Sequence, residues 1–479
     1  MKPFLSQVAE HIHTNYSSDL QNVCIVVPNR RSIVFLKKRL AEVYQKPFLA
    51  PAFFSIEDFF AYITGIDIAG QEEQLLTLYQ IHLAILAEKQ KSEQPSLHEF
   101  SGQAQLIIND FNELDSYLVD ADTLFSSLYS IKELSFFGKQ EDELTDFQKN
   151  YLAFFKELKI YYTRFTNTLL QQNKGYQGLI YRKAAENIVA YIEKLPYSNY
   201  VFAGFNALTK AEEITIEYLL SINKLDYLID ADSFYSQNPI HEAGRFIRKT
   251  QNGIFKDKPL SFTGNYFAET PKKIHIIGLP QPVMQAKYVN KILDDISLTN
   301  NNLDNTAIVP ADESLLLPIL HAIDTSNANI TMGYPIKRTI LYQLLSDLLF
   351  ALDNKNKFNK KACPECREVN ETSIRLYYKD LYAFFNNPYI RDLVNKDNDL
   401  RPDIAHMLQK NAKLFYSADE YKQLTINLLP HINELFFNLF FADDTVSTIC
   451  KKMQTLLVEI YKNGSTQEAA VRYDNEIER

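Results

Sequence analysis

Residues 332–338 (MGYPIKR) combine side chains that could hold a single strand of nucleic acid. Gly333 allows a tight turn, and Tyr334 offers an aromatic ring on which a base can stack. Lys337 and Arg338 supply two cations for the phosphates of the same strand. The segment therefore predicts a grip on a nucleic-acid strand, although an ordinary turn between two parts of the fold is the alternative.

Nucleotide hydrolysis would need chemistry that the sequence does not contain. A phosphate-binding loop of the form GxxxxGK[ST] cradles phosphates with backbone amides and places a lysine against them, and no such motif occurs. Gly65 and Gly70 have the glycine spacing, but Gln71 and Glu72 follow and would place acidic charge against phosphate. The apolar run 200–205 also ends without a carboxylate for a magnesium–nucleotide complex. We expect no ATP hydrolysis by this chain.

Candidate metal ligands are sparse in the sequence. Asp230 and Asp232 follow an apolar run, so a metal-dependent nuclease with an unrecognised site there is one alternative. Cys363 and Cys366 form a CPEC pair, but the other two cysteines lie far along the chain. An iron–sulfur cluster needs four such ligands. We expect no metal and no cofactor in this chain.

Composition limits the class of protein. Lys plus Arg total 50 against 59 Asp plus Glu, so the net charge is −9 and nucleic-acid binding must come from a local patch. Glycine contributes only 13 of 479 residues, which favours a helix-rich protein with few hairpins. Four scattered cysteines, no signal-peptide pattern and no apolar stretch of about 18 residues predict a cytoplasmic protein without membrane contact.

Hydrophobic periodicity predicts a strand–helix beginning for the chain. Residues 22–27 (NVCIVV) indicate a buried strand, and residues 32–44 follow with helical spacing. Long amphipathic patterns predict helices through most of 71–194. Another buried strand is predicted at 200–205, followed by a helix that opens at Thr209 with a capping box.

The second half of the chain repeats the mixture of short apolar runs and helices. Residues 273–279 (KIHIIGL) and 305–310 (NTAIVP) predict two buried strands, separated by a helix over 283–296. From residue 341 onward the pattern is helical, with a polar break over 353–371. The chain therefore reads as two α/β units, each associated with a large helical block.

Six segments follow one another in an order that resembles the amino-terminal, helicase-like half of AddB-like subunits of bacterial helicase–nucleases, a PD-(D/E)XK nuclease family. They are VPNRRSIVFLKKRL, FLAPAFFSIEDFF, NDFNELDSYLVDADTLFSSL, YVFAGFNALTKAEE, NTAIVPADESLLLPIL and NITMGYPIKR. The resemblance covers nearly all 479 residues. It implies a helix-dominated α/β fold like that of superfamily 1 helicases, with two RecA-like parallel-sheet lobes that carry large α-helical insertions.

The resemblance also implies domain boundaries. They are 1–66 with 195–265 for a discontinuous first lobe, 67–194 for its helical insertion, 266–350 for part of a second lobe, and 351–479 for a second helical insertion. The rest of the second lobe and a nuclease domain are expected beyond Arg479. Mg²⁺ and an iron–sulfur cluster are expected only in that nuclease domain.

The resemblance assigns DNA contacts near the start of the chain. Asn29, Arg30 and Arg31 correspond to helicase motif Ia, at the end of a strand where a loop can meet phosphates. Ser55 lies where motif Ib would touch the same DNA strand, although it is also a good N-cap for the helix that follows. A solvated basic loop is the alternative for residues 29–31.

The function implied is that of an inactivated ATPase that binds or channels DNA, as a single strand or a fork. It would act in double-strand-break resection and recombinational repair, as a heterodimer with an AddA-like ATP-driven helicase subunit. The first alternative is an interaction scaffold for a motor or nuclease partner without DNA contact, which the acidic net charge favours. The second is the metal-dependent nuclease at Asp230 and Asp232.

Overall fold

The computed structural model shows a helix-dominated α/β protein. It describes residues 2–464 except 91–94, 135–145, 257–260, 301–302, 304, 326–327, 334, 363–373, 396–403, 412 and 442–444. The chain forms two compact units, Met1–Ile274 and His275–Arg479. Within the described ranges, no helix combines the length and the apolar character needed to cross a membrane.

A five-stranded parallel sheet organises the first unit. Its order is β2-β1-β5-β6-β7, with β1 Val23–Val27, β2 Ala52–Ser55, β5 Asn199–Ala203, β6 Leu225–Asp232 and β7 Ser261–Gly264. The predictions of strands at 22–27 and 200–205 are confirmed to within two residues. Strand β7 lies in a stretch whose polar composition gave no strand pattern.

Both faces of the sheet are covered by helices. Side chains alternate along a strand, so Cys24 and Val26 of β1 enter one core and Ile25 and Val27 enter the other. The first core includes residues of α3 Ile56–Thr64, α8 Gln177–Glu186, α9 Ile188–Ile192 and α10 Lys210–Ser221. The second includes residues of α1 Phe4–Tyr16 and α2 Arg30–Tyr44. The capping box predicted at Thr209 opens α10.

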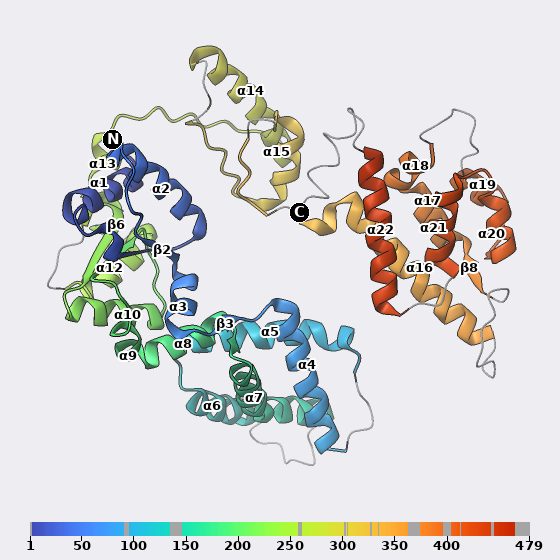
Figure 1. The fold of residues 1–479 in the computed structure, drawn as a ribbon, viewed down its shortest axis with the longest axis horizontal. Helices are drawn as coiled ribbons and strands as arrows, with labels where there is room; N and C mark the ends of the chain where they lie inside the picture. Colours follow the sequence, from blue (N-terminus) through green and yellow to red (C-terminus); the bar gives the residue numbers. More distant parts are fainter. Residues whose placement is uncertain are drawn as a thin grey trace. The chain divides into compact units, whose positions relative to one another are not determined.

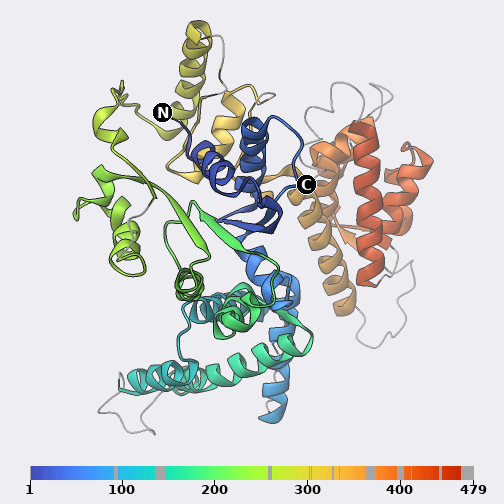
Figure 2. The same cartoon turned by 60° about the vertical axis from the view of Figure 1, so that its left-hand side comes forward.

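A helical block interrupts the sheet between β2 and β5 (Figure 1). It contains α4 Gln71–Glu88, α5 Leu97–Ser116, α6 Ala121–Leu134 and α7 Asp146–Gln171. Two short parallel strands, β3 Asp67–Ile68 and β4 Lys174–Gly175, pair where the chain enters and leaves the block. In the view of Figure 2, α6 and α7 lie along each other and α4 crosses them. The block has its own apolar core, so it folds as a distinct layer of the first unit.

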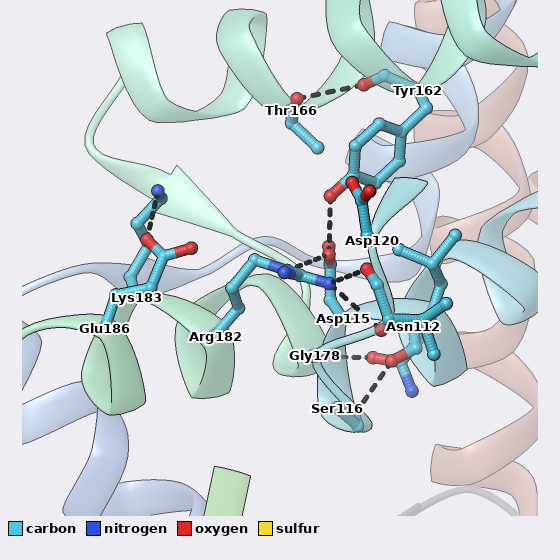
Figure 3. Close-up of polar contacts among 12 residues, drawn as sticks. Asn112, Asp115, Ser116, Asp120, Tyr162, Thr166, Gly178, Arg182, Lys183 and Glu186 are labelled. Carbon is cyan, nitrogen blue, oxygen red and sulfur yellow. Dashed lines mark hydrogen bonds and ion pairs between the residues drawn. The ribbon is translucent and has the colours of Figure 1, made fainter. Parts of the chain in front are cut away.

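A buried carboxylate joins this block to helix α8, which also packs on the sheet layer. Asp115, at the end of α5, is fully buried and accepts hydrogen bonds from the hydroxyls of Tyr162 (2.6 Å) and Tyr176. The Nε of Arg182 in α8 donates to the same carboxylate at 2.5 Å, and its Nη2 donates to the carbonyl of Val119 at 2.7 Å (Figure 3). The charge is therefore paired and hydrogen-bonded, as burial requires.

Helices α5 and α8 also approach closely at a glycine. The backbone N–H of Gly178 donates to the side-chain Oδ1 of Asn112 at 2.7 Å. A Cβ at Gly178 would lie only 2.1 Å from the carbonyl oxygen of Asn112. Glycine is required here because the two backbones leave no room for a side chain.

The second unit is helical apart from one small antiparallel pair. Its elements are α14 Pro282–Asn300, α15 Leu316–Ala322, α16 Ile340–Ala362, β8 Arg375–Tyr377, α17 Tyr378–Asn386, α18 Pro388–Asn395, α19 Ile404–Lys410, β9 Phe415–Ser417, α20 Ala418–Leu424, α21 Pro430–Phe441 and α22 Val446–Gly464. Helices α16 to α22 share one large core rich in phenylalanine. Helices α14 and α15 share only a small cluster around Ala286, Leu315 and Ile319.

Three predictions for residues 273–362 are wrong, namely two strands and part of a polar break. Residues 273–279 and 305–310 belong to no strand, and their side chains are open to solvent, with Ile276 exposed to 94% and Val309 to 86%. A β-branched run becomes a strand only when a neighbour pairs with its backbone, and the described part of the chain supplies none here. The polar break predicted from residue 353 is also wrong up to Ala362, because α16 continues through it.

Replacement of Asp115 by alanine should strongly destabilise the first unit. The change leaves Arg182 and two tyrosine hydroxyls without their shared acceptor, so we expect a loss of about 3–5 kcal/mol in unfolding free energy, measured by urea denaturation. Glu88→Ala removes a solvent-exposed pair with Arg164 and should leave the midpoint unchanged. Equal effects of the two variants would contradict a central role for Asp115.

Replacement of Gly178 by alanine should destabilise the same junction through a steric clash. We expect a loss of about 2–3 kcal/mol in urea unfolding, because the carbonyl of Asn112 cannot yield without moving a helix. Gly102 in α5 is the matched control, because a Cβ there meets nothing within 4 Å. Gly102→Ala should stabilise the helix by about 0.5–1 kcal/mol. An unchanged unfolding free energy in Gly178→Ala would show that α5 and α8 pack less tightly than described.

Candidate nucleic-acid interface

The carboxyl ends of the parallel strands meet at one edge of the first unit's sheet, called here the carboxyl edge. Strand β2 lies on one side of β1, whereas β5, β6 and β7 lie on the other, so the strand order reverses between β1 and β5. Open α/β sheets bind ligands at the carboxyl edge beside such a reversal. A ligand is therefore expected near the segments that leave β1 and β5.

The segment after β5 turns at Gly204, which packs against α1. Gly204 has a φ of +85°, a conformation that glycine adopts without strain. A Cβ at this residue would lie 3.4 Å from a ring carbon of Phe4, in α1, and 3.9 Å from Pro28. Asn206, two residues later, is exposed, so polar side chains at the reversal come from this segment as well as from the segment after β1.

Asn29 ends that segment and opens α2. Its side-chain Oδ1 accepts hydrogen bonds from the backbone N–H and the hydroxyl of Ser32, at 3.0 and 3.1 Å. Arg30 and Arg31 are then the first two residues of α2, and the first turn contains no acidic residue. Cations at a helix N-terminus reinforce the positive end of the helix dipole instead of balancing it. This placement disfavours the isolated helix and favours an anion at the carboxyl edge.

Arg30 is held by a carboxylate from the next strand connection. Its Nε and Nη2 donate to the two oxygens of Asp58 in α3, at 2.9 and 2.5 Å. Ser55 donates from its hydroxyl to Asp58 at 2.6 Å and accepts from the Asp58 backbone N–H at 3.2 Å. The bond from Arg30 lowers the pKa of the Asp58 carboxyl, and the bond from Ser55 lowers it further. The pair with Asp58 therefore orients Arg30 and also partly neutralises its charge.

The sequence predicted residues 29–31 and Ser55 as contacts of one DNA strand. The structure places them on adjacent strand ends, β1 and β2, and Asp58 joins Arg30 to Ser55. Ser55 is the N-cap of α3, as predicted, and is only 3% exposed. Its hydroxyl is engaged as donor and acceptor, so its role here is to position Asp58. A contact between Ser55 and DNA stays a prediction.

Arg31 differs from Arg30 in having no carboxylate partner in the described structure. It is exposed at the start of α2. Lys38, two turns later, is exposed as well, whereas Arg39 pairs with Glu42 at 2.8 Å. Arg31 is therefore the cation at the carboxyl edge whose charge no neighbouring acid offsets.

The residues predicted from MGYPIKR lie in the second unit. Lys337 and Arg338 are exposed in a 3₁₀ turn, Ile336–Arg338, just before α16, and Gly333 has open space around its Cα. Tyr334 lies outside the described residues. The candidate residues 29–31 and Ser55 therefore belong to the first unit, whereas the candidates from MGYPIKR belong to the second.

Asp232, one of the two acids considered for a metal site, has other bonds in the structure. Asp232 accepts the backbone N–H of Phe234 at 2.9 Å with one oxygen and that of Phe267 at 2.8 Å with the other. A metal at Asp230 and Asp232 would compete with both bonds. Among the described residues, which do not include Cys363 and Cys366, no group of three or more metal-binding side chains occurs.

Three cations at helical spacing on α12, Arg245–Asn252, do not form a free basic face. Arg248 donates to backbone carbonyls of the preceding loop, including that of His241 at 2.8 Å. Lys249 pairs with Glu213 at 2.8 Å, and Arg245 lies 3.7 Å from Glu242. These cations are therefore partly offset by their own neighbours.

Two features at the carboxyl edge were not predicted. Asp58 follows Ser55 in the spacing S-x-x-D, a helix-start signal that could have revealed the cap but not the distant partner Arg30. Aromatic residues of α11 Ser233–Ser236 and α13 Tyr266–Glu269 gather where β6 and β7 end. No sequence signal joins these two helices, which are far apart along the chain.

The fold and the geometry define a helix-dominated α/β protein whose parallel sheet presents cations at its carboxyl edge. Comparison with protein families found no matching family model, and comparison with curated proteins found no match. Because a fold does not by itself specify function, the chemistry of the residues at that edge decides what the protein can bind.

Replacement of Asp58 by asparagine should strengthen binding of a single-stranded oligonucleotide. The amide keeps the bond with Ser55 but releases the guanidinium of Arg30 for a phosphate, so the slope of log K against log salt should steepen by up to about 0.7, the value for one phosphate contact on a single strand. Fluorescence anisotropy at several salt concentrations measures this slope. Asp122→Asn, on an exposed acid of α6, makes the same change in net charge. Equal gains in both variants would indicate a general charge effect instead of a site.

Proposed function

We propose that this chain is the non-catalytic, helicase-like portion of an AddB-like subunit of a bacterial helicase–nuclease. In this proposal the first unit is a RecA-like lobe of the superfamily 1 type, and it binds a DNA strand at the carboxyl edge of its sheet. The bound DNA is a single strand or a fork, held during double-strand-break resection and recombinational repair. An AddA-like partner supplies ATP-driven movement in a cytoplasmic heterodimer.

The observation that carries the proposal is the pair of arginines at the start of α2. They stand at the carboxyl edge beside the strand reversal, without an acid in the first helical turn. The helix dipole adds to the attraction of these cations for phosphate. Backbone phosphates are the groups that such cations bind without reading sequence.

The architecture of the first unit supports the same proposal. A parallel sheet covered on both faces, with a helical block inserted between β2 and β5, matches the layout that the resemblance implies for a first lobe. The six sequence segments that carry the resemblance fall in both units. A contribution of Lys337 and Arg338 to DNA binding is part of the proposal.

A second candidate function is an interaction scaffold, and the exposed apolar segments of the second unit favour it. Ile276 and Val309 are open to solvent, and a hollow of about 440 Å³ lies between residues 308–312 and helices α14 and α15. Exposed apolar groups of this extent are typical of surfaces that meet another chain. A scaffold without DNA contact would show no salt-dependent DNA binding.

Replacement of Arg31 by alanine should weaken DNA binding and flatten its salt dependence. Loss of one phosphate contact should reduce the slope of log K against log salt by about 0.7 on single-stranded DNA, because fewer counterions are released. Arg30→Ala/Arg31→Ala should weaken binding further. Arg39→Ala removes the same charge from the same helix, but from a pair with Glu42, and should change little. Absence of wild-type binding to single-stranded DNA at low salt would reject the DNA function in favour of the scaffold.

A further inference from the structure

Four rings form a cluster where strands β6 and β7 end, and they are called here the aromatic cluster: Phe234, Tyr235, His241 and Phe267. Phe267 lies 4.6 Å from Phe234 and 5.1 Å from Tyr235 between ring centroids, and His241 lies 4.9 Å from Phe234. Phe234 is 37% exposed and Phe267 is 42% exposed. Neither α11 nor α13 contains a buried residue. The rings therefore pack on one another at the surface instead of entering a core.

The helices that carry the cluster are held by a shared carboxylate. Asp232, the last residue of β6, accepts the backbone N–H of Phe234 and that of Phe267. Lys272 closes the other end of α13, because its ammonium donates to the carbonyl of Phe267 at 2.6 Å. The same ammonium stands 4.9 Å from the centre of the Phe267 ring. Two separate segments of the chain are thus fixed with their rings side by side.

Arg248 holds a third segment of the cluster, the loop of residues 235–241, in place. Its guanidinium donates to four backbone carbonyls, those of Tyr235, Asn238, Pro239 and His241. A Cβ at Gly244 would lie 2.0 Å from the carbonyl oxygen of Tyr235, so the loop is closely packed against the start of α12. Polar bonds of this number hold exposed aromatic rings in one arrangement, which is the preorganisation that a binding surface needs.

The cluster lies on the same edge of the sheet as Arg31. All strands are parallel, so the ends of β6 and β7 face the same way as the end of β1. Strand β6 is two places from β1, or roughly 10 Å across the sheet at the usual spacing of strands. It also extends four residues beyond the level of Val27, because Leu228 is level with the end of β1 and β6 ends at Asp232, which adds roughly 13 Å along the strand direction. Stacked nucleotides repeat about every 3.4 Å along one strand, so about five nucleotides would bridge the two places.

The charge around the cluster suits an anionic ligand. Residues 230–273, which include Asp230 and Asp232, contain seven lysine and arginine residues and five acidic residues, a local excess of positive charge in a chain whose net charge is −9. Lys272 places one of these charges against the rings themselves. Rigid aromatic faces beside cations are the surfaces on which bases of single strands stack, whereas the bases of a duplex are not accessible to them.

We propose that the aromatic cluster is a base-stacking platform, with Phe234 and Phe267 contacting the bases of a single nucleic-acid strand whose phosphates reach Arg31. This inference rests on the proposed DNA function and assigns to it a ligand form and a set of residues outside the predicted ones. In this proposal the aromatic cluster contacts the unpaired bases of the nucleic acid, and Arg31 contacts its phosphate backbone.

The chain contains no tryptophan, so a single introduced tryptophan reports directly on stacking. Phe267→Trp places an indole in the cluster, and Phe154→Trp places one at an equally exposed position of α7 in the helical block. An oligothymidylate should quench the fluorescence of Phe267→Trp and leave that of Phe154→Trp unchanged. Quenching of neither variant at a DNA concentration that saturates anisotropy would overturn the platform.

Affinity provides the second measurement. Phe234→Leu/Phe267→Leu keeps apolar side chains but removes the aromatic faces, so affinity for the oligothymidylate should fall at least about fivefold with an unchanged salt slope. Affinity for a duplex of equal length should not change. If the leucine variant binds single strands like the wild type while Arg31→Ala still flattens the salt slope, the platform is wrong and the DNA function stands; the cluster would then suit a protein partner. If the wild type binds no DNA, both proposals fail.

Discussion

The parallel pairing of β1 with both β2 and β5 is the constraint on which the first unit depends. Every residue of β1 is buried, because the strand lies between two neighbours and under helices on both faces. Parallel strands must be joined by crossover connections, and here these connections place α2, α3 and the helical block. They also bring the ends of all the strands to one edge, where Asn29, Arg31 and the aromatic cluster lie.

Two polar networks of this unit serve different purposes. The network of Asp115 is buried and closed: its carboxylate accepts from Tyr162, Tyr176 and Arg182, and it joins the helical block to α8. The bonds of Asp58 and Asp232 lie at the carboxyl edge and fix side chains that stay exposed. Because the Asp115 network is buried, the stability that its bonds give to the fold is enough to explain it. The second orients cations and rings toward solvent, which stability alone does not require.

Local signals in the sequence predicted the elements that position this edge. A β-branched run ending at Pro28 located β1, and the spacing from Thr209 to Glu212 located the start of α10. The strands predicted at 273–279 and 305–310 failed because strand formation depends on a pairing neighbour, which local composition does not reveal. Strand β7 was missed because a short polar edge strand has no apolar alternation.

Partners distant in sequence explain the rest of what sequence could not predict. Arg30 was a candidate DNA contact, but its pairing with Asp58 joins residues from two crossovers and could not be read from either segment. The aromatic cluster joins Phe234 to Phe267 through Asp232, so it exists only after β6 and β7 pair. The fold brings these residues together, whereas the local sequence shows only that each residue is present.

The most direct test of DNA binding at the carboxyl edge is hydrogen exchange of the whole chain, measured by mass spectrometry with and without a saturating oligothymidylate. We predict slower exchange in the segments that leave β1, β6 and β7, namely residues 28–32, 233–241 and 265–269, with the amino ends of the same strands unchanged. Protection at the amino ends, or no protection at the carboxyl edge when binding is saturated, would contradict the account.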